Sequence, residues 1–99
     1  MTNTYLNMIG LAYRARKLST GEETILRDIQ TKRAKLVLIA SDIGYQTEKK
    51  LTDKCKTYNV PFKVVDDRET IAAAIGKSAR VAIAVLDAGF AKKIQSLLL

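Results

Sequence analysis

The sequence predicts an α/β fold, because short apolar runs alternate with longer segments that have helical periodicity. Residues 36–40 and 81–86 are uninterrupted apolar runs, which is typical of strands covered on both faces. The connecting segments are long enough for crossover helices, so we expect mostly parallel neighbouring strands with helices on both faces. A chain of 99 residues also predicts one domain, spanning residues 1–99.

The first third of the chain predicts two helices and leaves room for a short strand. Residues 4–16 form the first expected helix, and the pattern breaks near Leu18, where a fourth short strand fits. Residues 20–23 indicate a second helix start, with the Thr20 hydroxyl as N-cap and Glu23 three residues later. The expected apolar stripes are Leu6, Ile9 and Tyr13 in the first helix, and Ile25, Leu26 and Ile29 in the second.

The remaining two thirds alternate strands and helices that are separated by Asp, Asn and Gly. Asp is a favoured helix N-cap, and Asn and Gly tolerate the left-handed turn that ends a helix. The elements expected after the strand at residues 36–40 are a helix marked by Thr47, Leu51, Cys55 and Tyr58 that turns at Asn59; a strand over residues 60–65; a short helix capped by Asp66 or Asp67 and closed by Gly76; a strand over residues 81–86; and a last helix capped by Asp87.

The charge balance narrows the classes of partner. Lys and Arg number 17 against 10 Asp and Glu, which gives a formal charge of +7 and a sequence pI of about 9.7. A pI above roughly 9 in a small domain is one footprint of nucleic-acid binding, although a basic surface without a ligand has the same composition. Residues 1–35 hold seven basic and three acidic side chains, so the excess is expected on one face.

Several other functions are disfavoured by what the sequence lacks. It has no His, no Gly-x-x-x-x-Gly-Lys-Ser/Thr loop and no Gly-x-Gly-x-x-Gly turn, so we expect neither an enzyme nor a cofactor. Cys55 is the one cysteine and is expected to be a buried thiol in a reducing compartment. With no apolar run of membrane-spanning length and no secretory signal at the N-terminus, we expect a cytoplasmic protein and no membrane partner.

A group of carboxylates supplies one alternative to nucleic-acid binding. Asp42, Asp66, Asp67 and Asp87 all follow predicted strands, and ligands of open parallel sheets sit at the carboxyl ends of strands. Such a cluster could hold Mg²⁺ or accept a phosphoryl group. Helix N-capping explains the same four residues without a ligand.

The start of the second helix is the best candidate for binding a polyanion. Residues 21–24 expose backbone N–H groups at the positive end of the helix dipole, and Lys17, Arg27 and Lys32 are expected to surround them. The carboxylate of Glu23 could accept hydrogen bonds from the N–H groups of a guanine edge, or it could serve only as a helix cap.

Several segments in a fixed order carry a resemblance to a known family; they are residues 7–17 (NMIGLAYRARK), 19–23, 33–42, 51–55, 58–61, 75–77 and 88–91. Together they resemble the kink-turn RNA-binding family of ribosomal proteins (the "L-seven-Ae" family), most closely its small bacterial members of the YlxQ type. The resemblance covers nearly the whole chain. It implies a three-layer α/β/α sandwich around a four-stranded mixed sheet, and RNA binding without catalysis.

The resemblance also implies a site. The family recognises a kink-turn, a sharply bent RNA with tandem G·A pairs, through a Gly-x-Asn-Glu segment, a cation one turn later and a loop that packs on an extruded nucleotide. Aligned here, Gly21 matches the glycine, Glu23 and Thr24 stand at the Asn and Glu positions, Arg27 matches the cation, and residues 64–68 match the loop. The expected RNA-binding residues are Lys17, Gly21, Glu22, Glu23, Thr24, Arg27, Lys32, Arg33, Val64 and Val65.

The expected partner is structured RNA, most simply ribosomal RNA or the ribosome, bound by a monomer. Because an ionised Glu only accepts hydrogen bonds whereas Asn both donates and accepts, Glu23 also supports an alternative. In that alternative the chain is a protein-docking module on the ribosome or on translation factors, and it has lost kink-turn specificity.

Overall fold

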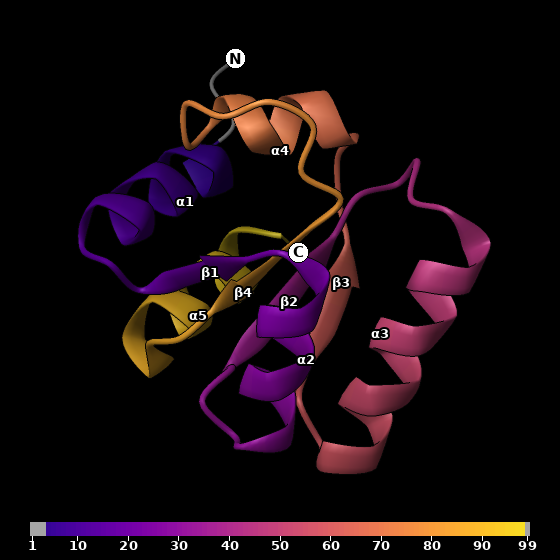
Figure 1. The fold of residues 1–99 in the computed structure, drawn as a ribbon. Helices are drawn as coiled ribbons and strands as arrows, with labels where there is room; N and C mark the ends of the chain where they lie inside the picture. Colours follow the sequence, from indigo (N-terminus) through magenta and orange to yellow (C-terminus); the bar gives the residue numbers. More distant parts are fainter. Residues whose placement is uncertain (1–3, 99) are drawn as a thin grey trace.

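The structure is a computed structural model that describes residues 4–98 (Figure 1). Helices and strands alternate along the described chain almost as the sequence predicts. In order, the elements are α1 (Thr4–Arg14), β1 (Leu18–Thr20), α2 (Glu22–Gln30), β2 (Leu36–Ile39), α3 (Tyr45–Tyr58), β3 (Phe62–Val64), α4 (Arg68–Ala73), β4 (Ala82–Val85) and α5 (Ala88–Leu97). The predicted short strand near Leu18 is therefore present as β1, and β3 is shorter than the predicted residues 60–65.

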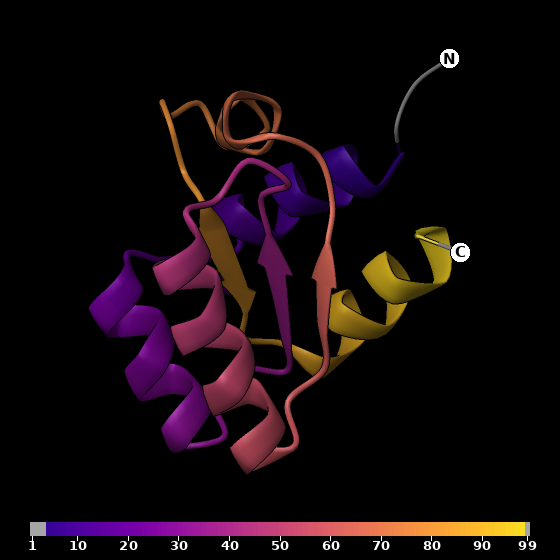
Figure 2. The ribbon, with the colours of Figure 1, turned by 90° about the vertical axis from the view of Figure 1, so that its right-hand side faces the viewer.

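The four strands form one mixed sheet in the order β1-β4-β2-β3. Only β2 and β3 are parallel, whereas β4 runs antiparallel to both of its neighbours, β1 and β2. The expectation of mostly parallel neighbours is wrong. The short helix α4 lies across the end of the sheet instead of returning along it, so β4 starts at the end where β3 stops (Figure 2).

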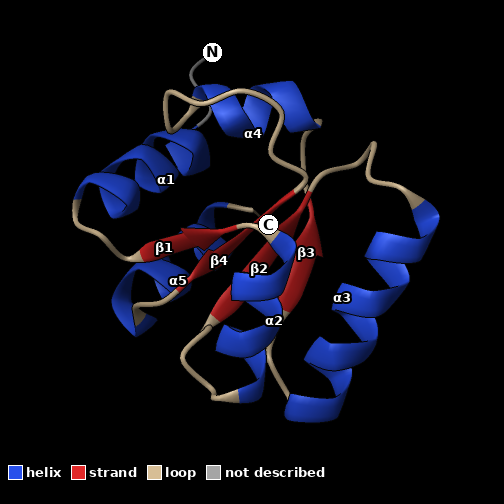
Figure 3. Ribbon diagram, viewed as in Figure 1, coloured by secondary structure: helices blue, strands red, loops and turns tan. Residues whose placement is uncertain are grey.

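Helices cover both faces of this sheet and complete the three-layer α/β/α sandwich (Figures 2 and 3). One layer contains α2 and α3, and the other contains α1, α4 and α5. Two sets of buried side chains fill the spaces between the layers. Ile25, Ile29, Leu51 and Cys55 pack on one sheet face with Val37 and Ile39, and Tyr5, Ile9, Ile71 and Ile94 pack on the other with Leu36, Leu38, Ile83 and Val85.

Three of the five predicted helix ends are confirmed, and Gly76 lies two residues beyond the C-cap of α4, Ala74. The carboxylates of Asp67 and Asp87 accept hydrogen bonds from the N–H groups of Thr70 (2.8 Å) and Phe90 (2.9 Å), and Asn59 ends α3 in the left-handed conformation. The predicted Thr20 N-cap of α2 is wrong. Thr20 is the last residue of β1, so Gly21 begins the helix, and no side chain caps it.

The antiparallel direction of β4 also separates the carboxylates that suggested a Mg²⁺ site. Asp87 follows β4 at one end of the sheet, whereas Asp42 and Asp66 follow β2 and β3 at the other. Asp42 accepts hydrogen bonds from Nε of Arg68 (3.2 Å) and from its backbone N–H (2.9 Å). Within residues 4–98, no three His, Cys, Asp or Glu side chains are grouped to hold a metal ion.

Asp66 has a structural partner of its own. It accepts a hydrogen bond from the hydroxyl of Tyr5, which joins α1 to the β3–α4 connection. Burial and this hydrogen bond raise the pKa of Tyr5, so the phenol keeps its proton.

In the part of the chain that the structure describes, no helix combines the length and the apolar character needed to cross a membrane.

Candidate nucleic-acid interface

The start of α2 lies open to solvent, as a phosphate or base site requires. Gly21 is exposed and adopts φ 92° and ψ 132°, a conformation that L side chains rarely adopt. The first N–H groups of any α-helix have no partner within the helix, and the helix dipole makes them attractive to anions and to carbonyl oxygens. The glycine therefore lets a ligand approach backbone donors that no side chain of the helix cap covers.

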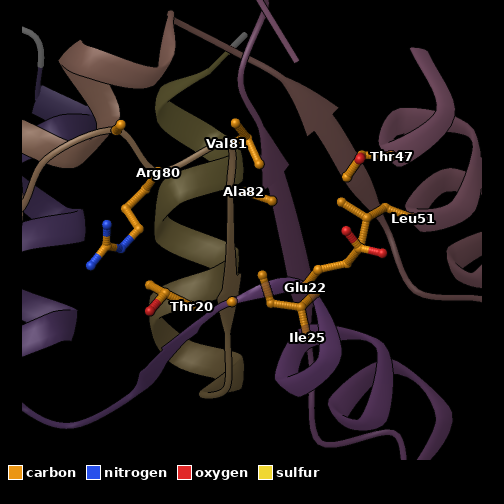
Figure 4. A pocket seen from close by; sticks show the side chains of 10 residues that line it. Thr20, Glu22, Ile25, Thr47, Leu51, Arg80, Val81 and Ala82 are labelled. Carbon is orange, nitrogen blue, oxygen red and sulfur yellow. The ribbon is translucent and has the colours of Figure 1, made fainter. Parts of the chain in front are cut away.

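A pocket of about 300 Å³ opens beside Gly21 (Figure 4). Its apolar floor is formed by Ile25 of α2, Leu51 of α3 and Ala82 of β4, each at most 4% exposed. Thr20, Glu22, Thr47 and Arg80 supply polar groups at its rim. An apolar floor with a few polar groups at the rim is the usual construction of a small-ligand pocket, and this volume is at the small end of the range.

The segment between α4 and β4 forms one wall of this pocket and was not predicted from the sequence. Ala79, Arg80 and Val81 line it. Ala79 has φ 46°, and the Arg80 guanidinium donates to the carbonyl of Ser78, so the segment is held in a defined turn. The sequence does carry a signal for this wall, because a basic Lys-Ser-Ala-Arg stretch stands directly before a predicted buried strand.

The two acidic side chains at the entrance differ in their surroundings. Glu22 accepts a hydrogen bond from Nζ of Lys50 on α3 (2.8 Å), and its side chain extends toward α3, whereas Arg80 extends away from it (Figure 4). This contact raises the pKa of Lys50. Glu23 and Thr24 are exposed on the outer face of α2. Glu22 therefore links α2 to α3 through an ion pair, whereas Glu23 and Thr24 are open to solvent.

The predicted cations do not all surround the helix entrance. Arg27 is exposed in the last turn of α2. Lys17, Lys32 and Arg33 lie at the opposite end of the sheet, because Lys17 precedes β1 and the other two follow α2. There they line a second depression with Arg16 and Lys35. The sequence thus identified two basic regions that it could not separate.

Val64 and Val65 share the end of the sheet with Gly21 but not its pocket. Val64 pairs with Ile39 on the edge strand β3, and β2 and β4 stand between it and β1. Val64 is 51% exposed, whereas Val65 is half-buried against the core. The structure brings Ala79 and Arg80, not the two valines, to Gly21. Tyr45, 76% exposed at the first turn of α3, is a further aromatic side chain at this end that sequence analysis missed.

Comparisons with known proteins agree with this architecture. The chain is 50% identical to the RNA-binding protein YlxQ of Bacillus subtilis (strain 168), over 92% of its own length and 91% of that protein. A solved structure of a Bacillus halodurans protein of unknown function is 46% identical, covers 98% of both chains and superposes with a TM-score of 0.95. The Giardia lamblia 15.5kD RNA binding protein shares the fold at 19% identity, with a TM-score of 0.76 over 93% of this chain and 85% of that one. Residues 4–95 match the Ribosomal protein L7Ae/L30e/S12e/Gadd45 family, and the chain belongs to this family.

Proposed function

We propose that this chain is a non-catalytic protein that binds folded RNA through the start of α2 and the adjoining pocket, as one domain over residues 1–99. The observation that carries the proposal is the exposed Gly21, with no side-chain cap, beside a pocket with an apolar floor. A helix entrance binds phosphate or base acceptors, and an apolar pocket next to it receives a base that has left its stack. The name of the Bacillus subtilis relative, an RNA-binding protein, supports the same conclusion.

Each group at the entrance has a role in this proposal. An extruded base enters the mouth of the pocket, while Arg80 at the pocket and Arg27 in the last turn of α2 contact phosphates of the same RNA. Glu23 accepts hydrogen bonds from the Watson–Crick edge of a guanine, and Thr24 supports this contact. A single extruded base next to exposed guanine edges is a feature of a kink-turn-like element, so we propose that class of RNA as the target.

A binding titration with matched hairpins tests the proposal. One hairpin carries an internal loop with tandem G·A pairs and an extruded nucleotide, and its control replaces the loop with Watson–Crick pairs. Fluorescence anisotropy is expected to show at least about tenfold tighter binding to the first hairpin, the equivalent of ~1.4 kcal/mol. Equal affinity for both hairpins would contradict recognition of a bent element, and no binding to either would contradict RNA binding.

We further propose that the RNA belongs to the cytoplasmic translation machinery and that the protein binds it as a monomer. The family match to ribosomal proteins supports this location. Sedimentation of the tagged chain with ribosomes, followed by ribonuclease treatment, tests it. Release by ribonuclease is expected.

A protein-docking function is the second candidate, because acidic Glu22 and Glu23 stand at the helix entrance. Retention on ribosomal proteins after complete removal of RNA would favour this second function.

A further inference from the structure

A second basic surface lies at the end of the sheet opposite Gly21. Five cationic side chains and Leu86 line a depression of about 320 Å³, called here the basic groove; the cations are Arg16, Lys17, Lys32, Arg33 and Lys35. Three chain segments meet there: the α1–β1 turn, the α2–β2 turn and the residues after β4. Backbone hydrogen bonds fix them together, from Leu86 N–H to the Lys17 carbonyl (2.8 Å) and from Lys35 N–H to the Val85 carbonyl (2.7 Å).

Two of the five cations of the basic groove donate hydrogen bonds to backbone carbonyl oxygens. Nζ of Lys32 donates to the carbonyl of Tyr58, and Nζ of Lys35 donates to the carbonyl of Lys32 (2.9 Å). Among residues 4–98, the one ion pair that involves the groove joins Arg33 to Asp28, at a distance of 3.9 Å. Neutral carbonyls position an ammonium group without cancelling its charge. The basic groove therefore keeps a net positive charge that attracts an anion.

The backbone of the basic groove is strained where it presents two of these cations. Arg16 and Lys32 have φ angles of 61° and 63°. A glycine usually occupies such a left-handed position after a helix, since other residues incur a conformational penalty of about 1 kcal/mol or more. Strain that is retained with a charged residue is a reason to look for a function of that charge.

We propose that the basic groove binds the phosphate backbone of an RNA double helix that flanks the element held at Gly21; this inference rests on the proposed function. Among residues 4–98, no aromatic side chain lines the groove for a base to stack on, and half-buried Leu86 is its one apolar member. It therefore suits phosphates, which position an RNA without reading its sequence. An acidic protein would need a larger apolar centre than Leu86 supplies.

The geometry of α2 connects the two surfaces. Its nine residues span about 14 Å at ~1.5 Å per residue, with Gly21 at one end and the basic groove at the other. Exposed Arg27 lies between them. A stem that leaves the pocket along α2 meets the basic groove within a few base pairs. One of the two stems of a bent RNA therefore gains phosphate contacts, and the other stem does not.

Stem length is the variable that tests this inference. The probes are the G·A hairpin with stems cut close to the internal loop, and two versions in which one stem or the other is longer by about ten base pairs. Lengthening one particular stem is expected to tighten binding several-fold at low salt. It is also expected to steepen the slope of log affinity against log salt by ~0.7–0.9 per added phosphate contact.

The test variant combines Arg16→Gly, Lys17→Gln and Lys35→Gln, and leaves Arg33 in place because it pairs with buried Asp28. It is expected to bind the long-stem RNA no better than the short one and to keep wild-type affinity for the short one. A control variant with Lys63, Lys92 and Lys93 changed to Gln loses the same charge outside the groove. It should still bind the long-stem RNA more tightly than the short one.

Three outcomes would overturn the inference. If the test variant retains the long-stem gain, the groove does not contact the stem, and a ligand of another class such as an acidic protein occupies it. If the test variant loses affinity equally for the short and the long RNA, the groove residues act only through the net charge of the protein. If the wild-type protein binds the short RNA but gains nothing from either long stem, the inference fails and the proposed function stands. Failure of the wild-type protein to bind any of these RNAs would instead remove the proposed function itself.

Discussion

The two ends of the central sheet present different surfaces, although the same strands connect them. The Gly21 end has an exposed helix start and a pocket with an apolar floor, with Glu22 and Arg80 among its polar lining residues. The basic groove at the other end is lined by five cations and one apolar side chain, Leu86. Apolar pockets with a few polar groups discriminate between ligands by shape, whereas exposed cations attract phosphates of any sequence. The comparison leads us to propose that specificity and general affinity for a polyanion are placed on separate parts of this small fold.

Charge reversal at Arg80, which lines the Gly21 pocket, and at Arg27, in the last turn of α2, is expected to have the largest effect on binding. The double variant Arg27→Glu, Arg80→Glu places two carboxylates where phosphates should lie, so affinity for the short G·A hairpin should fall about 100-fold, or ~2.7 kcal/mol. Anisotropy titration measures the loss. The variant Lys63→Glu, Lys92→Glu makes the same change in net charge elsewhere, and an equal loss there would erase the distinction between the two ends.

The backbone at Gly21 gives the largest expected effect on stability. Gly21→Ala puts a Cβ on a residue at φ 92°, which should lower the free energy of unfolding by about 2 kcal/mol. Gly44 is the matched control, since it also begins a helix but has φ −67° and open space where a Cβ would lie. Urea denaturation should show Gly44→Ala within about 0.5 kcal/mol of wild type. Similar losses in both variants would show that the φ angle of Gly21 is not what matters.

The charge of Glu23 tests which part of the RNA meets the helix start. If its carboxylate accepts hydrogen bonds from a guanine, Glu23→Gln should weaken binding to the G·A hairpin about tenfold, because charge-assisted hydrogen bonds are the stronger kind. If Glu23 faces phosphates, the same change should tighten binding. Glu69, an exposed acid in the first turn of α4, is the control position, and Glu69→Gln should leave affinity unchanged.

Cys55 is buried between α3 and the sheet, so its thiol tests how tightly this layer packs. Burial raises the pKa of its thiol to about 11 from an ordinary value near 9. The unfolded chain therefore releases this proton at lower pH than the folded chain, so stability is lost as pH rises above 9. At pH 10 the loss should be about 1 kcal/mol.

A Cys55→Ala variant has no thiol to titrate and should show a correspondingly flatter dependence of unfolding free energy on pH between about 8.5 and 11. Urea titrations across this range provide the measurement. Parallel curves for the two proteins would mean that the thiol is accessible in the folded state.

The smallest expected effect is at the basic groove, where stability and binding should change in opposite directions. Arg16→Gly removes the strain of φ 61° and should raise the free energy of unfolding by about 0.5 kcal/mol. Asn59→Gly is the control, since Asn already tolerates the left-handed region and should change less. A marked loss of stability in Arg16→Gly would show that the side chain is structural and would weaken its assignment to RNA.

Features that depend on neighbours in sequence were predictable. The apolar runs of β2 and β4 and the caps at Asp67 and Asp87 rest on local preferences, and the structure confirms them. The direction of β4 was not predictable, because it depends on the path that α4 takes across the end of the sheet. That direction separates Asp87 from Asp42 and removes the predicted carboxylate cluster.

The candidate site was only partly predictable for the same reason. Gly21 and Arg27 belong to one local pattern, and both are exposed as expected. Arg80 reaches the pocket only through the pairing of β1 with β4, which no local pattern reports. Lys17 and Lys35 are brought together by strand register in the same way. The sequence therefore predicted one surface where the structure has two.

The three residues of β1 join Lys17 to Gly21 and are hydrogen-bonded to β4 along their whole length. The distance between the two surfaces is therefore set by β1 and by its pairing with β4, and a bound ligand has to fit this distance. Under the proposed function, the cost of deforming the ligand falls on the RNA, so we expect RNAs that already have the right curvature to bind more tightly. Divalent cations that pre-bend an RNA should consequently increase its affinity for this protein, although they compete for the same phosphates.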